Sequence, residues 1–363
     1  MLPAYDPHTE YSHWDAGLWT RVLAASGTLN PFTRAPFTEA MLAGLAGGIG
    51  FMIFTFEYKE TTTASVVTRF HPGPYTENLL RRSGASVNIQ QTGSATLAQS
   101  RLDAALETGV PAVVRVVRGK LPWAASDAMA DMDSMDVAIV ARDGAGYLMD
   151  DGGGRLEWIA ADALAQARGS RKADKHWQAH VVQGSGAELA GEILTDAVVR
   201  QAIAETAHAL LTRQAPPGIP PGYAKNFGIL GMQQWAERLR DTSTKRGWAR
   251  IFGDPQRSVA GLGMLHGLLA GKRFSGPGAL RPLHAQFLQE LAGLADGAAG
   301  VGLPADVMRA AAAQYRDLGE RWDDLAELIG RDGEPDFAAM AAIVDHLAVL
   351  ETTAALGMQK SVE

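Results

Sequence analysis

The chemistry open to this chain does not include a thiol, because its 363 residues contain no cysteine. Thiol nucleophiles, thiolate metal sites and disulfides are therefore excluded together. Carboxylates and imidazoles remain as candidate bases. His13 and Asp15 lie on either side of Trp14 before a helix-like run, Asp136 opens an apolar strand-like run, and Asp151 precedes three glycines. These are the positions at which we look for acid–base chemistry.

Neither a metal nor another cofactor is expected. The nine histidines are scattered, and none lies in a His-Glu-x-x-His pattern. His176 and His180 fall in a strand-like segment, where their spacing would separate them by about 13 Å, too far to share one ion. The segment Gly47–Gly50 precedes a strand and lacks the lysine and hydroxyl residue of a phosphate-binding loop.

The elements that must position the candidate residues in the first half mix helix-like and strand-like periods, as in an α/β domain. Helices are predicted over residues 17–26, 37–45, 75–83, 94–108 and 160–168. Strands are predicted over residues 51–56, 64–70, 86–90, 111–117, 136–141 and 146–149, with a hairpin turn at 142–145.

The second half is almost wholly helical in periodicity. Proline- and glycine-rich separators divide it into predicted helices over residues 195–213, 228–241, 243–252, 256–270, 281–295, 304–329 and 336–356. The pattern changes near residues 184–193. We therefore predict an α/β domain at residues 1–186 and an all-α domain at residues 187–363.

Composition limits the classes of partner. The net charge of −7 disfavours nucleic acid, which needs a basic face. The N-terminal residues lack the pattern of a signal peptide, and the longest apolar stretch, residues 41–56, is too short for a membrane span. We expect a cytoplasmic protein without a membrane partner. The predicted helix at 195–213 carries apolar residues on more than one face, which predicts an oligomer with itself or with an unrelated subunit.

Several short strings follow one another in a set order along the chain. In the first half they are His13-Trp14-Asp15-Ala16-Gly17-Leu18, Phe37-Thr38-Glu39-Ala40-Met41, Thr76-Glu77-Asn78-Leu79 and Gly109-Val110-Pro111. In the second half they are Asn226-Phe227-Gly228-Ile229-Leu230-Gly231, Leu280-Arg281-Pro282-Leu283-His284 and Tyr315-Arg316. This order resembles the butirosin-biosynthesis H family, in which a papain-like domain precedes a helical domain. The resemblance covers nearly the whole chain, and it implies a papain-like mixed sheet for residues 1–186.

The chain departs from the family pattern at both catalytic positions. The family has His-Cys near residue 13, with the cysteine opening a helix whose dipole lowers the thiol pKa. Trp14 occupies that position in this chain, and indole offers no nucleophile. The family's histidine base corresponds to Asp136. The resemblance therefore implies a degenerate cysteine-acyltransferase cleft between the two domains, without an acyl-cysteine.

Within that cleft the resemblance suggests catalytic roles for Asp136, Asp15 and His13. A buried carboxylate at Asp136 would have a raised pKa and act as a general base, whereas a solvent-facing Asp136 would simply end a loop. The alternative role for Asp15 is that of an N-cap, which is the more common use of an aspartate at a helix start. His13 would orient the substrate.

Substrate contacts are expected from Trp14, Arg69, Arg118, Asp151 and Asn226. Arg69 and Arg118 lie near predicted strand ends and would hold an anionic group, with solvated surface charge as the alternative. Asp151 would orient the base or form an Asx turn. Asn226 would be the contribution of the helical domain.

We therefore expect a cofactor-independent biosynthetic enzyme of specialised metabolism that uses non-covalent general-base chemistry. The favoured reaction is ring closure by an amine with loss of an anionic leaving group, for example aziridine formation by loss of sulfate. The substrate would be amino-acid-derived or bound to a carrier protein, the substrate class that the resemblance implies. The alternatives are a non-catalytic scaffold or partner subunit, and a thiol-independent acyltransferase to an amine.

Overall fold

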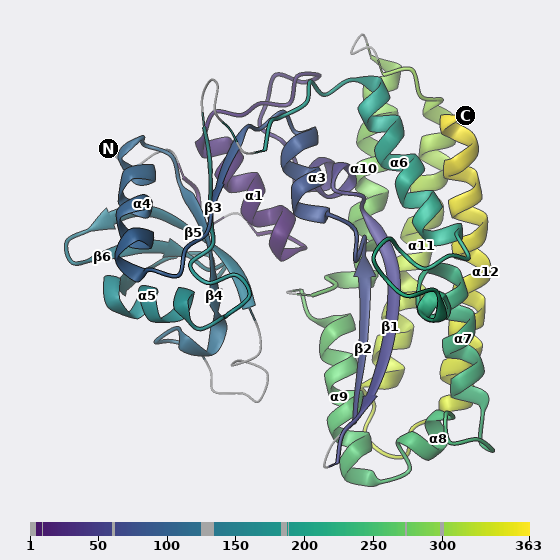
Figure 1. Ribbon diagram of the computed structural model, residues 1–363. Coiled ribbons are helices and arrows are strands. Elements are labelled where there is room, and N and C mark those ends of the chain that lie inside the picture. Colours follow the sequence, from purple (N-terminus) through teal and green to yellow (C-terminus); the bar gives the residue numbers. More distant parts are fainter. Residues whose placement is uncertain are drawn as a thin grey trace. The chain divides into compact units, whose positions relative to one another are not determined.

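The computed structural model describes residues 5–8, 10–59, 62–124, 134–182, 187, 189–272, 274–297 and 301–363 (Figure 1). The chain forms two compact units. The first, termed the mixed unit, consists of Met1–Leu42 and Leu80–Leu194. The second, termed the helical unit, consists of Ala43–Leu79 and Thr195–Glu363. An α/β part followed by a helical part confirms the predicted fold class.

The mixed unit is built on a six-stranded antiparallel sheet of order β3-β8-β4-β5-β6-β7. Its strands are β3 (Val87–Gln90), β4 (Ala112–Val117), β5 (Ser134–Asp143), β6 (Gly146–Asp150), β7 (Leu156–Ala160) and β8 (Gln178–Val181). Its helices are α1 (Trp14–Ala25), α4 (Ala95–Glu107) and α5 (Ala161–Gly169), with a 3-10 turn, η1 (Arg118–Lys120). The sequence analysis missed β7.

One apolar core joins this sheet to α4 and α5. Leu102 of α4 and Leu164 of α5 are buried in the same cluster as Val114 and Ile139 of the sheet. The hairpin between β5 and β6 has the predicted turn, in which Gly144 adopts a φ of +58°. Glycine is suited to this left-handed conformation because it has no Cβ to clash.

The helical unit combines a hairpin with a bundle. The hairpin strands are β1 (Ile49–Glu57) and β2 (Thr62–Arg69). The bundle helices are α6 (Asp196–Leu211), α7 (Gly228–Arg240), α8 (Trp248–Ile251), α9 (Pro255–Ala270), α10 (Arg281–Asp296), α11 (Ala305–Ile329) and α12 (Phe337–Val362), with 3-10 turns η2 (Pro221–Asn226) and η3 (Pro277–Leu280). Strand β2 packs along α9, and β1 packs against α6 and α7 (Figure 1).

Two short helices, α2 (Glu39–Leu45) and α3 (Tyr75–Arg82), carry the chain from one unit to the other. The division by packing therefore differs from the predicted division by sequence, since residues 43–79 belong to the helical unit. The predicted boundary falls beside residues 183–186 and 188, which lie outside the described ranges.

One predicted helix is wrong. Residues 243–252 contain only the single turn α8, because the Asp241 side chain accepts hydrogen bonds from the backbone N–H groups of Ser243 and Thr244. These bonds offer the backbone an alternative to a helix.

Helix α12 is long and apolar enough to span a membrane by length and composition. Part of its apolar surface is buried against α6, α7 and α11, as in the core helix of a bundle, so this is weak support for a membrane span. The inward residues of α6 are likewise buried within the unit. The apolar character of α6 therefore needs no second subunit, and the oligomer and the cytoplasmic location remain predictions.

Candidate functional site

Trp14 begins α1 and lies beside Asp136 in the mixed unit. Its indole Nε1 donates a hydrogen bond to the backbone carbonyl of Asp136 over 2.9 Å. A Cβ added at Gly152, whose φ is +80°, would overlap the indole ring, so the glycine lets the backbone approach it closely. The two residues to which the resemblance assigns the family's catalytic positions therefore lie next to each other. Trp14, to which the resemblance assigns the nucleophile position, donates one hydrogen bond and packs against Gly152.

The carboxylate of Asp136 forms an ion pair with Arg115. The two residues face each other across β4 and β5, and Nε and Nη2 of Arg115 lie 2.7 and 3.0 Å from the two carboxylate oxygens. Nη1 of the same guanidinium lies 3.0 Å from Oδ2 of Asp174, and its Cζ lies 4.6 Å from the Trp177 ring centroid. A bidentate pair of this kind combines two charge-assisted hydrogen bonds in a fixed geometry. Asp136 would have to give up this pairing to act as a base, and its catalytic role remains a prediction.

His13 and Asp15 frame the start of α1. His13 is the N-cap residue, and its backbone N–H donates over 2.6 Å to Glu39, which also accepts from the N–H of Ser12. Burial raises the pKa of Glu39, although these two hydrogen bonds oppose the rise. The N-cap interpretation of Asp15 is wrong, because His13 is the N-cap and Asp15 lies within the first turn. There its negative charge interacts favourably with the helix dipole. Sequence reasoning overlooked Glu39.

Asp150 is fully buried and is paired with Arg21 of α1. Its Oδ2 lies 2.7 Å from Nε of Arg21 and accepts a hydrogen bond from the Tyr5 hydroxyl over 2.6 Å. Burial and the neighbouring carboxylate raise the pKa of Tyr5. Asp151 forms the predicted Asx turn by accepting from the N–H of Gly153, and it also accepts from Nε1 of Trp123. Both carboxylates therefore have structural partners.

The other predicted substrate contacts belong to different units. Arg118 lies in η1 of the mixed unit, while Arg69 and Asn226 lie in the helical unit. Asn226 donates its side-chain amide to the carbonyl of Ile53 over 2.6 Å and so fastens η2 to β1. The guanidinium of Arg69 lies 5.1 Å from the ring centroid of Tyr75. Their grouping with Asp136 in one site remains a prediction.

The helical unit contains a cavity of about 710 Å³, which the sequence analysis did not foresee. This volume suits a small-molecule ligand. Its lining comes from β1, from the segment that follows β2, from α6 and from the segment that follows α6. Phe51 and Phe227 are buried apolar members of the lining.

Polar side chains of α6 form part of the lining of this cavity. Gln201, Glu205 and His208 all line it, and Gln201 donates its side-chain amide to Glu205 over 2.8 Å. Their spacing of four and three residues puts them on one face of the helix, a polar stripe that could have been read from the sequence. The Glu205 carboxylate could bind a cation or an amine.

His71 lines the same cavity, two residues beyond Arg69 in the chain. Burial, followed by the positive charge of Arg69, lowers the pKa of His71 below its ordinary value of 6.5. The imidazole is therefore mainly neutral at pH 7 and able to accept a proton. Within the described ranges, no cluster of three or more His, Asp or Glu side chains is arranged to hold a metal ion.

Comparison with known families gives two matches that follow one another along the chain. Residues 16–152 match the family described as butirosin biosynthesis protein H, N-terminal. Residues 162–356, more than half of the chain, match a domain of unknown function (DUF4872). No curated protein matches the chain.

Proposed function

The chain belongs to the butirosin biosynthesis protein H family, a family of antibiotic biosynthesis, and on that premise we propose that it closes a ring on an amine substrate without a covalent enzyme intermediate. The amine nitrogen attacks a carbon that bears an anionic leaving group, such as sulfate. A nitrogen–carbon bond forms and the carbon–oxygen bond breaks, with its electron pair leaving on sulfate. Loss of sulfate from a vicinal amino sulfate ester in this way would give an aziridine.

The observation that carries this proposal is the chemistry of the 710 Å³ cavity. Glu205 offers a carboxylate for the amine, and neutral His71 offers an acceptor for the proton that the nitrogen releases. Arg69, which does not itself line the cavity, is close enough to His71 to lower its pKa. Proximity and orientation within such a cavity can supply about 7–11 kcal/mol of the barrier.

The absence of cysteine supports a non-covalent route, because no thioester can form on the enzyme. Turnover should therefore be unchanged after treatment with iodoacetamide. Asp136 is the competing base. Its bidentate pair with Arg115 favours a structural role for this carboxylate, whereas the His71 imidazole lines a cavity.

The test is single-turnover product formation, followed by mass spectrometry, on vicinal amino sulfate esters supplied free and as carrier-protein thioesters. His71→Gln should lower the rate by about 10²–10⁴-fold, the usual contribution of general acid–base catalysis. Glu205→Gln should chiefly raise KM. His346→Gln, an exposed position on α12, is the matched control and should keep the full rate.

Asp136→Asn separates the two candidate sites, since the substitution keeps the shape of the side chain and removes its charge. If a folded Asp136→Asn variant is inactive while His71→Gln turns over normally, the cavity is not the site and the mixed unit holds the base. In that case Asp15→Asn and His13→Gln become the next variants to measure. A product that has gained an acyl group instead of losing sulfate would identify the thiol-independent acyltransferase.

A second candidate function is a non-catalytic subunit of a biosynthetic complex. It is favoured by the mixed unit, in which Trp14 and the Asp136–Arg115 pair supply hydrogen bonds and packing at the two family catalytic positions. This reading predicts no turnover by the wild type with any of these amines. It also predicts that a neighbouring biosynthetic enzyme gains activity and co-elutes with the chain.

A further inference from the structure

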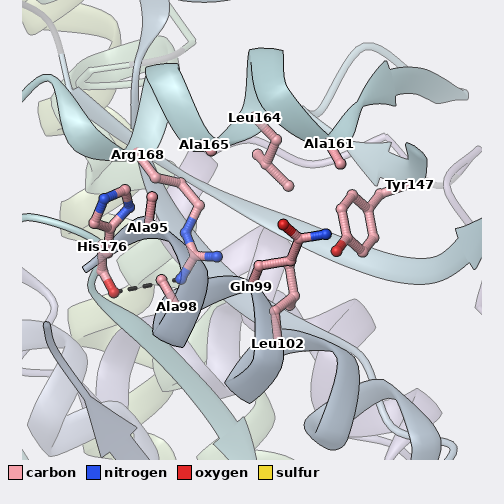
Figure 2. Close-up of a pocket in the computed structure, with 10 residues that line it drawn as sticks. All are labelled: Ala95, Ala98, Gln99, Leu102, Tyr147, Ala161, Leu164, Ala165, Arg168 and His176. Carbon is pink, nitrogen blue, oxygen red and sulfur yellow. Dashed lines mark hydrogen bonds between the residues drawn. The ribbon is translucent and has the colours of Figure 1, made fainter. Parts of the chain in front are cut away.

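A second, much smaller cavity lies in the mixed unit, between α4 and α5 and beside Tyr147 of β6 (Figure 2). Its volume is about 10 Å³. That is close to the roughly 10–15 Å³ needed to hold a single water molecule or an ion of similar size. Most of its wall is alanine and leucine, and its polar lining residues are Gln99, Tyr147, Arg168 and His176.

Arg168 places a buried positive charge at this cavity. The residue is 3% exposed, and Figure 2 shows its guanidinium pointing into the space between the helices. Nη2 donates to the carbonyl of His176 over 3.3 Å and to the side-chain oxygen of Gln178 over 3.0 Å. Both acceptors are neutral. Nε is buried and has no hydrogen-bond partner among the described residues.

The charge of Arg168 is not balanced by an acidic group in the part of the chain that the structure describes. Asp103 accepts from the Tyr147 hydroxyl beside the cavity, but its carboxylate is already paired with Arg142. Burial lowers the pKa of Arg168 to about 10, so the guanidinium still carries its proton at pH 7. An isolated buried cation of this kind is strongly disfavoured unless an anion accompanies it.

His176 supplies a second buried polar atom without a partner. It is 3% exposed, has a φ of +52°, and lines the cavity with its Nδ1 unbonded among the described residues. Burial and the charge of Arg168 lower its pKa, so the ring is neutral. A neutral imidazole can present an N–H at Nδ1, which makes it a donor suited to an anion.

We propose that this cavity binds a chloride-sized monovalent anion, held by the Arg168 guanidinium and by the N–H of His176. A water molecule in the same place would meet the hydrogen-bonding demand but would leave the charge uncompensated. The bound anion would fasten α5 to α4 and to the residues before β8, and so stabilise the mixed unit. This inference is independent of the proposed reaction.

The first test uses bromide as the probe. Crystals of the full chain soaked in sodium bromide should show an anomalous peak within hydrogen-bonding distance of Arg168. Thermal unfolding of the wild type at constant ionic strength, with gluconate replaced by chloride or bromide, should show Tm rise by about 3–6 °C at 0.5 M halide. Equal Tm in gluconate and in both halides, or no anomalous peak at the cavity, would overturn the proposal.

Two variants tie the effect to the cavity. Arg168→Met removes the charge, and Ala165→Val narrows the cavity while keeping Arg168 in place. Both should lose the halide-dependent rise in Tm. Arg155→Met removes an exposed arginine paired with Glu157 and is the matched control that should keep the rise. If Arg168→Met does not fold, Ala165→Val decides, and an unchanged halide dependence in Ala165→Val would contradict the proposal.

Discussion

His284 should make the protein sensitive to acid. This residue of α10 is 2% exposed, stacks edge-on against Tyr315 and lies over Gly48. Its Nε2 lies 3.2 Å from the sulfur of Met358, and its Nδ1 has no partner among the described residues. The charge that acts on the imidazole is the cation of Arg281, which is paired with Glu351. No carboxylate among these contacts would stabilise an imidazolium.

The sign and size of the effect follow from the pKa. Burial, followed by the charge of Arg281, lowers the pKa of His284 from 6.5 to about 3. Below pH 6.5 His284 binds a proton in the unfolded chain, whereas in the folded chain it stays neutral until about pH 3. The free energy of unfolding therefore decreases as the pH falls from 6.5 to 3. Relative to pH 8, the free energy of unfolding should fall by about 2 kcal/mol at pH 5 and about 3 kcal/mol at pH 4 from this residue alone.

The assay is urea unfolding of the wild type and of His284→Leu, followed by tryptophan fluorescence at pH 8 and pH 5. The leucine variant has no proton to bind, so its loss of stability between the two pH values should be smaller than that of the wild type by about 2 kcal/mol. His346→Leu, at an exposed position on α12, controls for loss of a histidine. An identical loss in wild type and His284→Leu would refute the reasoning.

Three further substitutions test the packing of Trp14 and a buried ion pair. Gly152→Ala and Gly154→Ala are matched in φ (+80° and +79°), but only the first adds a Cβ against Trp14. In thermal unfolding Gly154→Ala should cost about 1–2 kcal/mol and Gly152→Ala a further 1–3 kcal/mol, and equal losses would contradict the packing of Trp14. Glu351→Gln leaves the buried Arg281 without its carboxylate and should destabilise by about 3–5 kcal/mol, so a loss below 1 kcal/mol in urea unfolding would contradict the importance of this ion pair.

The sequence predicted most elements because their signals are local. The helix predicted over residues 17–26 and the hairpin turn predicted at residues 142–145 each follow from residues close in sequence. One failure was local, because Asp241 replaces a helix with a turn after residue 241. The others came from longer range. Strand β7 is short and pairs with β6, and the hairpin at residues 49–69 packs with helices whose sequence begins after residue 194. Periodicity shows that such segments are strands but not which helices cover them.

The candidate site was harder to predict, because a side chain's chemistry depends on the partner it meets. The resemblance gives Asp136 the position of a base, yet its partner Arg115 is set by the register of β4 against β5, which the sequence does not reveal. Likewise Glu39 and Asp150 find their partners 26 and 129 residues away. His71 was passed over because its neighbours in the cavity, from α6, are more than 120 residues further along the chain.

The resemblance implies that a thiol nucleophile has been replaced at Trp14, and such a replacement would change what the mixed unit has to do. A catalytic cysteine and histidine must stay reactive, so their polar atoms cannot all be used for stability. Trp14 and Asp136 are under no such demand, and each makes a hydrogen bond or ion pair within the unit. Chemistry that does not need a thiol is therefore better sought where polar groups line open space, as Glu205 and His71 do. If the mixed unit has become a support, substitutions there should lower stability and turnover together, whereas His71→Gln should lower turnover and leave the unfolding curve unchanged.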